Sequence, residues 1–361
     1  MIERFYTGTL SYSLPWYNWE TSMKILLFFV AIVAVAGLFF RLGQKSNFEF
    51  QIPTTKNLAK PAEKPLDKYT YENLAKTKFL PSKITFGESL GENQNFKSHL
   101  FFFEVEGKKI SGLANVPNTP GTYPVVILFR GYVDRENYQT GVGSQRVGEF
   151  FAQNDFITLA PDFLGYGQSD DPSASPIEER FQTYITALTL LESTTNLNET
   201  LAANNLAARA KTQKIAIWGH SNGGQIALTV LETTGKNFPT VLWAPVSKPF
   251  PYSTLYYTDD FDDHGKKLRK VVADFEKDYD AQLYSLTNYL QKINAPIQLH
   301  QGEADESVPL RWSNQLFDEL GKLEKEVTYF KYSGADHNLS GSWKLAASRS
   351  LEFFNSKLQN Q

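Results

Sequence analysis

Two patterns of hydrophobic and polar residues divide the chain beyond about residue 82. Residues 83–116 alternate apolar and polar side chains in short stretches such as HLFFFEVEG and KKISGLANV, which predicts antiparallel strands. Further along, short segments are apolar throughout, as is typical of parallel strands buried on both faces of a sheet. The strand candidates are 124–129, 156–161, 214–219, 240–245, 295–300 and 327–332.

Helical stretches separate these apolar strands. The helix candidates are 140–153, 177–195, 223–235, 265–293, 310–322 and 342–358. This alternation predicts an α/β fold with a mostly parallel central sheet and helices on both faces. Functional groups in such folds gather at the carboxyl ends of the strands. Residues 246–293 are longer than a simple crossover and predict a helical insertion over the sheet edge.

An uncharged apolar run lies near the N-terminus. Residues 25–40 read ILLFFVAIVAVAGLFF between Lys24 and Arg41. The run is slightly shorter than the ~20 residues that span a bilayer comfortably, but lysine and arginine side chains can extend toward the interface. We therefore expect a single-pass membrane anchor over 24–41, preceded by a tail over 1–23. A cleaved signal peptide and a buried core helix are the alternatives, and the flanking charges do not indicate which side of the membrane the rest of the chain faces.

A polar, lysine-rich segment follows the apolar run. Residues 42–81 contain Pro53, Pro61 and Pro65 and show little periodicity, which predicts a linker. The expected organisation is therefore an anchor, a linker and one α/β domain over residues 82–361.

Composition excludes several classes of function. With 361 residues, of which 42% are hydrophobic and 21% charged, the chain has an ordinary globular composition. The net charge of −3 and the lack of a basic stripe indicate no nucleic-acid partner. The absence of cysteine excludes disulfides, thiolate metal sites and a cysteine nucleophile. The acidic stretch 259–264 lacks the glycine turn and distal glutamate of a calcium loop, so we expect no metal and no cofactor.

A G-x-S-x-G motif occupies residues 219–223, between a predicted strand and a predicted helix. This context is that of a nucleophile elbow, a sharp turn that presents the serine hydroxyl at the sheet edge. Gly219 and Gly223 supply the small neighbours that such a turn requires around Ser221. On the motif alone, an ordinary glycine-rich turn remains the alternative.

A serine nucleophile needs a base, and the base needs an acid to orient it. In α/β architectures the expected chain order is serine, acid, histidine, with each partner just after a strand. His337 in GADHN follows strand candidate 327–332 and is the predicted base, whereas His300 ends its own strand and is expected to be packed. Asp305 in HQGEADESVP is the predicted acid, with Glu303 in reserve; a helix-capping role is the alternative for Asp305.

The predicted oxyanion hole consists of two backbone N–H groups. One belongs to Asn222, directly after the nucleophile. The other belongs to Tyr132, because Gly131 lets the loop after strand candidate 124–129 turn sharply.

Five motifs in order carry a family resemblance: GLANVPNTPGTYPVVILFRGY, APDFLGYGQSD, GHSNGG, QGEADESVP and GADHN. Over roughly residues 83–358 the chain resembles the α/β-hydrolases, and more closely the catalytic domain of the prolyl oligopeptidase family. The resemblance implies Ser221 as nucleophile, Asp305 as acid and His337 as base. Two departures stand out. Arg130 occupies a position where many relatives have histidine, and the ~80 residues before the domain are too few for the propeller of many members.

The expected function is that of a membrane-anchored serine hydrolase, resembling a prolyl oligopeptidase-like peptidase, which cleaves a small ester or a short peptide through an acyl-enzyme. A carboxylesterase, lipase or acyltransferase that uses the same residues is one alternative. A non-catalytic binding protein on the same fold is another. The sequence predicts neither the exact substrate nor the oligomeric state.

Overall fold

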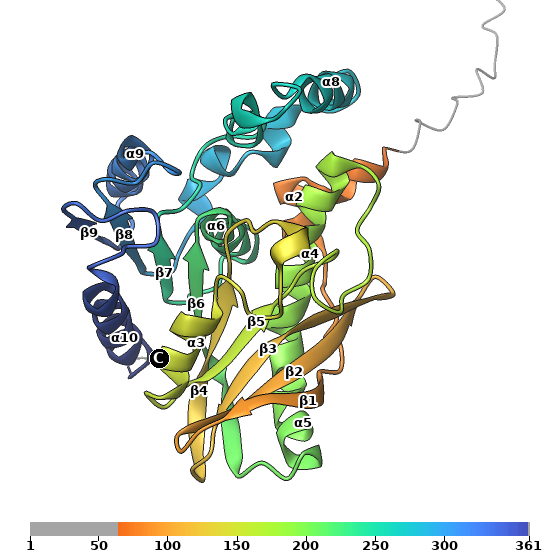
Figure 1. Cartoon of the computed structure of the whole chain (residues 1–361). Helices are drawn as coiled ribbons and strands as arrows, with labels where there is room; N and C mark the ends of the chain where they lie inside the picture. The colour runs from red at the N-terminus through yellow and green to blue at the C-terminus, as the bar shows by residue number, and fades with distance from the viewer. Residues whose placement is uncertain (1–63, 360–361) are drawn as a thin grey trace, which may run out of the picture. The chain divides into compact units, whose positions relative to one another are not determined.

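A twisted sheet runs through the part of the chain that the computed structural model describes, residues 64–359 (Figure 1). The expected tail and the anchor over 24–41 lie outside the described residues, as does most of the linker. Among the helices within 64–359, none combines the length and the apolar character needed to span a bilayer.

Nine strands of the described region form the sheet in the order β1-β2-β3-β5-β4-β6-β7-β8-β9. The first three pair antiparallel, as does β3 with β5, and all pairs from β5 to β9 are parallel. Their bounds are β1 Thr85–Glu92, β2 Phe96–Val105, β3 Lys108–Pro117, β4 Gly121–Phe129, β5 Ile157–Pro161, β6 Ala208–His220, β7 Thr240–Trp243, β8 Ile297–Gly302 and β9 Val327–Tyr332. The predicted antiparallel opening and mostly parallel continuation are confirmed.

The parallel strands are buried on both faces, which explains why they are apolar throughout. In β4, Val125 and Ile127 pack into the core on one face, whereas Val126 and Leu128 pack into the core on the other. The first core includes helices α4 Pro176–Ser193, α5 Leu197–Ala203, α6 Asn222–Thr234 and α9 Leu310–Lys322. The second includes α3 Gln145–Ala152 and α10 Trp343–Gln359, which contact each other (Figure 1).

The insertion between β7 and β8 differs from its prediction as one long helix over 265–293. It contains α7 Tyr252–Leu255 and α8 Lys266–Phe275, and the 3₁₀ turns Thr258–Asp260, Ala281–Tyr284, Leu286–Asn288 and Leu290–Lys292. The helix prediction is wrong beyond Phe275, where the side chain of Asp280 accepts a hydrogen bond from the N–H of Gln282 and starts a separate turn. The insertion packs on α4, with the rings of Phe275 and Tyr284 both against Phe181.

The folded unit begins upstream of the predicted boundary at residue 82. A 3₁₀ helix, Pro65–Tyr69, and α2, Tyr71–Lys76, lie within the segment expected to be linker. Tyr71 stacks on Tyr289 at 4.7 Å between ring centroids, and its hydroxyl bonds to that of Thr229 in α6 at 2.8 Å. The last part of the predicted linker is therefore a packed element, because its aromatic side chains are buried in the core.

Candidate active site

The predicted elbow is a single residue between a strand and a helix. Strand β6 ends at His220 and α6 begins at Asn222, which leaves Ser221 in the turn with φ 55° and ψ −121°. A serine rarely adopts this region, and such strain costs roughly 1–3 kcal/mol and is concentrated at functional sites. A Cβ atom on Gly219 would lie 2.6 Å from the carbonyl oxygen of Gly223, and one on Gly223 would lie 1.9 Å from that of Phe129. Any side chain at position 219 or 223 would therefore clash with the backbone, so both positions require glycine.

Backbone hydrogen bonds fix the turn against the end of β7. The N–H of Ser221 donates to the carbonyl of Trp243 at 3.0 Å, and the carbonyl of Ser221 accepts from the N–H of Val246 at 2.9 Å. The serine side chain therefore starts from a defined position at the N-terminal, positive end of α6.

The predicted base and acid are hydrogen-bonded to each other. Nδ1 of His337, on the loop after β9, lies 2.9 Å from Oδ2 of Asp305, on the loop after β8. The Asp305 side chain is fully buried, whereas the imidazole is 18% exposed. Glu303, the reserve acid, is exposed. Sequence order and geometry therefore select the same carboxylate.

The surroundings of Asp305 stabilise its ionised form. Oδ1 accepts the N–H groups of Ser307 and Val308, both at 2.8 Å, and Oδ2 accepts the side-chain amide of Gln301 at 2.7 Å. Burial alone raises the pKa of Asp305, but the His337 contact and these donors hold it below its ordinary value. The carboxylate therefore accepts the Nδ1 proton of His337, which leaves Nε2 as the proton acceptor of the ring.

His220 places the imidazole of His337 next to the elbow. The two rings are 4.6 Å apart between centroids, and Nε2 of His220 donates to the carbonyl oxygen of His337 at 3.0 Å. No hydrogen bond among the described residues joins the Ser221 hydroxyl to His337; such bonds are often long without substrate. Burial and the neighbouring His337 lower the pKa of His220 to about 4, so its ring is neutral and acts as a support.

The two expected oxyanion donors border one cavity. The loop after β4 passes directly beside Ser221, since a Cβ on Gly131 would lie 2.9 Å from Cβ of Ser221. Gly131, Tyr132 and Asn222 all line a cavity of about 260 Å³. Asn222 is the first residue of α6, where backbone N–H groups have no acceptor within the helix.

Arg130, which stands where many relatives have histidine, holds this loop. Its guanidinium donates to the carbonyl oxygens of Gly131 and Asp162, both at 2.8 Å. It also lies over the rings of Tyr138 and Tyr166, at 4.5 and 4.1 Å from their centroids. The sequence showed the departure but not this role, which depends on residues from a different loop.

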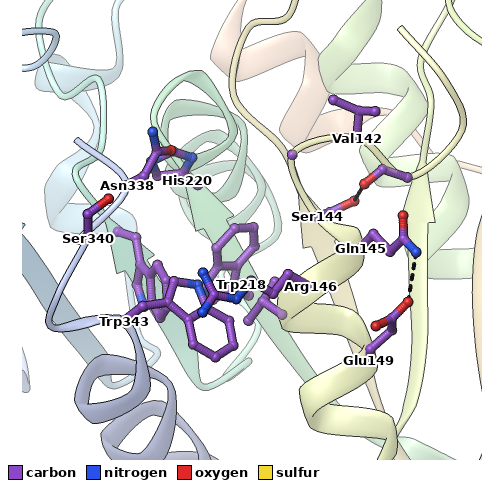
Figure 2. A pocket seen from close by; sticks show the side chains of 14 residues that line it. Val142, Ser144, Gln145, Arg146, Glu149, Trp218, His220, Asn338, Ser340 and Trp343 are labelled. Carbon is purple, nitrogen blue, oxygen red and sulfur yellow. Dashed lines mark hydrogen bonds between the residues drawn. The ribbon is translucent and has the colours of Figure 1, made fainter. Parts of the chain in front are cut away.

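A second cavity, of about 550 Å³, includes His220 in its lining (Figure 2). Its walls include Trp218, Trp343 and Asn338, and Arg146 lies 3.9 Å from the centroid of the Trp343 ring. Both cavities are assembled from segments far apart in the chain. Sequence patterns therefore gave no signal for either.

Two further features of the insertion are structural. Tyr256 packs on Trp312 at 4.7 Å between ring centroids and on Tyr257 at 5.1 Å, so these aromatic side chains pack the insertion against α9. In the acidic stretch, Asp259 pairs with Arg269 at 2.7 Å. Between residues 64 and 359 no cluster of His, Asp or Glu side chains could hold a metal ion.

Comparison with known proteins gives two family matches and one curated relative. The prolyl oligopeptidase family matches residues 194–361, and the chlorophyllase family matches residues 105–241. The uncharacterized peptidase YtmA of Bacillus subtilis (strain 168) is 26% identical over 252 residues, which are 68% of this chain and 88% of that protein.

Solved structures share the fold at low identity. Acetyl xylan esterase 1 from Thermoanaerobacterium sp. JW/SL YS485 superposes with a TM-score of 0.52 and 18% identity, over 80% of this chain and 93% of that chain. The acylaminoacyl peptidase of Pyrococcus horikoshii gives 0.53 and 20% identity, over 73% of this chain but only 42% of that chain. The α/β-hydrolase fold and the resemblance to the prolyl oligopeptidase family are confirmed. The chain is a serine hydrolase.

Proposed function

We propose that this serine hydrolase cleaves an ester or peptide bond through Ser221, His337 and Asp305, with an acyl-enzyme intermediate. The observation that carries the proposal is the hydrogen bond between Nδ1 of His337 and the buried carboxylate of Asp305, beside the strained elbow of Ser221. A paired imidazole next to a serine in this backbone conformation is the arrangement that activates a hydroxyl.

The reaction follows from these positions. Nε2 of His337 takes the hydroxyl proton as Oγ of Ser221 attacks the carbonyl carbon, and the carbonyl oxygen becomes an oxyanion. The N–H groups of Asn222 and Tyr132 donate to that oxyanion. His337 then gives its proton to the leaving alcohol or amine, and the acyl group stays on Ser221. Water, deprotonated by His337, releases the acid and restores the serine.

The substrate class follows from the resemblance and the cavity. A peptidase of the prolyl oligopeptidase type is the first expectation, supported by the family match and by the curated relative named a peptidase. An esterase is the alternative, supported by the fold of the acetyl xylan esterase. A cavity of about 260 Å³ suits a small acyl group or one side chain. Rates on p-nitrophenyl esters and aminoacyl-anilides, measured on one preparation, separate the two activities.

Labelling with a fluorophosphonate probe tests the nucleophile. We expect the wild-type chain and the control variant Ser340→Ala, an exposed serine on the His337 loop, to be labelled. Ser221→Ala is expected to lose labelling completely. Full labelling of Ser221→Ala contradicts the assignment, and a wild-type chain that reacts with no such probe supports a non-catalytic binding protein instead.

We further propose that residues 25–40 anchor the chain in a membrane, with the hydrolase domain outside the bilayer. The uncharged run between Lys24 and Arg41 supports this proposal. The full chain is expected to stay in the membrane fraction after extraction at alkaline pH and to be released by detergent. Release by alkaline extraction alone contradicts the anchor.

A further inference from the structure

The cavity beside the oxyanion loop is lined by two arginines that form no ion pair within the described residues. Three charged side chains line it: Arg130, Glu179 and Arg180. The guanidinium of Arg130 is engaged by backbone carbonyls and tyrosine rings. Glu179 forms an ion pair with Arg135. No carboxylate of the described chain pairs with Arg180, so the lining has an unbalanced positive charge.

Hydrogen bonds hold the Arg180 guanidinium but leave most of its donors unused. Nη2 donates to Oε1 of Gln225 at 2.6 Å, and the Gln225 amide in turn donates to the hydroxyl of Tyr184 at 2.7 Å. This is the one hydrogen bond that the guanidinium makes within residues 64–359. Its Nε is buried without an acceptor. A guanidinium has five N–H donors in a fixed plane, so most of those on Arg180 have no acceptor among the described residues.

The insertion adds further unpaired polar atoms near this position. Oγ1 of Thr254, which lines the same cavity, is buried without a hydrogen-bond partner. The hydroxyl of Tyr257, on the same segment and within the electrostatic range of Arg180, is also buried and unpaired. Unpaired buried donors cost about 1–3 kcal/mol each, and native proteins keep few of them. Because Arg180 and Thr254 both line this cavity, a ligand bound there can supply an acceptor for their unpaired donors.

We propose that the substrate carries a carboxylate, and that Arg180 binds this carboxylate while the scissile carbonyl lies at Ser221. The inference deepens the proposed function and rests on it, because Asn222 and Tyr132 border the same cavity as Arg180. Carboxylates match the planar guanidinium with two parallel hydrogen bonds, which gives orientation as well as affinity. Arg180 is thus a specificity-determining residue that distinguishes acidic from neutral substrates of equal length.

Matched esters test the inference. The neutral substrate is p-nitrophenyl valerate. Its acidic partner, mono-p-nitrophenyl glutarate, has the same chain length with a carboxylate at the far end of the acyl group. For the leaving group, p-valeryloxybenzoate carries the carboxylate and is compared with its neutral counterpart p-valeryloxybenzamide. We expect the wild-type chain to have a higher kcat/KM for one acidic ester than for its neutral partner. The ester that shows this preference identifies whether the substrate carries its carboxylate on the acyl group or on the leaving group.

Variants of two arginines isolate the effect of charge at Arg180. Arg180→Gln is expected to reduce the ratio of acidic to neutral kcat/KM by about tenfold to a hundredfold, the usual range for a charged hydrogen bond. Arg180→Lys, which keeps the charge but not the planar fork, is expected to retain part of the ratio. Arg146→Gln is the matched control, because Arg146 lines the other cavity. A loss of folded protein lowers kcat/KM for the acidic and the neutral ester by the same factor, so it leaves their ratio unchanged.

Three outcomes overturn the inference: no preference of the wild-type chain for either acidic ester, an unchanged ratio in Arg180→Gln, or the same change in Arg146→Gln. Failure of the proposed function is distinguishable, since Ser221→Ala would then hydrolyse the esters as well as the wild type. If the wild-type chain hydrolyses none of them, calorimetric titration with monomethyl glutarate and methyl valerate measures directly whether the site binds an acidic or a neutral compound. Binding of the glutarate that Arg180→Gln abolishes supports the site, and equal or absent binding of both overturns it.

Discussion

Two histidines at the ends of neighbouring parallel strands have opposite environments. His300 lies in β8 and is fully buried, with Nδ1 2.8 Å from the hydroxyl of Tyr332 and Nε2 2.8 Å from Oε1 of Gln298. His337 follows β9 on a partly exposed loop, and its partner is the carboxylate of Asp305. The strand pattern places His300 at the end of its own strand and His337 on the loop after the next strand, but it gives no partner for either ring. The partner and the exposure decide which imidazole can exchange a proton.

The electrostatics of the two positions agree with this difference. Burial, with a smaller contribution from the charge of Arg349, lowers the pKa of His300 to about 3. That ring is neutral at physiological pH and acts as a buried hydrogen-bonding group. The pKa of Asp305 is held below its ordinary value instead, by the His337 contact and by neighbouring hydrogen-bond donors, so the imidazole of His337 faces a negative charge.

The largest expected effect comes from removing the exposed imidazole. His337→Ala is expected to reduce kcat/KM by about 10⁴-fold to 10⁶-fold, because the Ser221 hydroxyl then has no base. The melting temperature should change little, since the side chain lies on a loop. Steady-state kinetics and thermal denaturation check both statements, and a variant that keeps a tenth of the activity contradicts the role of His337.

Asp305→Asn is expected to have the next largest effect, a loss of about 10⁴-fold in kcat. The amide removes the negative charge and favours the wrong tautomer of His337, while the shape of the side chain is conserved. Kinetics compared with Glu303→Gln, the exposed reserve acid, test this expectation. Equal losses in the two variants would leave the choice of acid without support.

His300→Leu is expected to lower the free energy of unfolding by about 2–5 kcal/mol, because Gln298 and Tyr332 lose their buried partner. The kcat/KM of the folded fraction should stay within a few-fold of wild type. Urea denaturation and active-site titration separate stability from activity. A large loss of activity at unchanged stability would reverse the roles assigned to the two histidines.

The smallest expected effect is a dependence of stability on pH. The folded-state pKa of His300 is below the unfolded value of 6.5, so its contribution is complete above that pH and is lost as pH falls toward about 3. His220 contributes with the same sign. Between about pH 7 and 5 the wild-type chain is expected to lose stability more steeply than His300→Leu. Equal slopes in urea denaturation would show that His300 is not neutral in the folded state.

The sequence predicted the elbow and the chain order well because both depend on local patterns. Five consecutive apolar residues, such as those of Val125–Phe129, indicate a strand buried on both faces wherever it lies. The glycines around Ser221 are required by contacts within a few residues of the turn and with the adjacent strand. The chain order of Ser221, Asp305 and His337 follows the order of the strands that precede them, so the Asp305 to His337 hydrogen bond could be expected before its distance was known.

Features that depend on distant segments were not predictable in this way. Tertiary contacts stabilise the 3₁₀ turns after Phe275 and the packed segment that contains Tyr71. Neither segment therefore needs a strong hydrophobic periodicity, and the sequence shows none. The counter-ion of Glu179 is Arg135, from a distant segment, and none of the ion pairs within residues 64–359 includes Arg180. A sequence shows which charges exist but not which of them cancel.

The contact between Tyr71 and helix α6 has a practical consequence for any shortened version of this protein. A fragment that begins at residue 82, where the alternating strand pattern starts, would lose Tyr71 and expose Thr229 and the face of Tyr289 on which it stacks. Because α6 also forms one side of the turn at Ser221, such a fragment would test a damaged hydrolase. Recombinant fragments intended for assay or crystallisation should therefore start before Pro65.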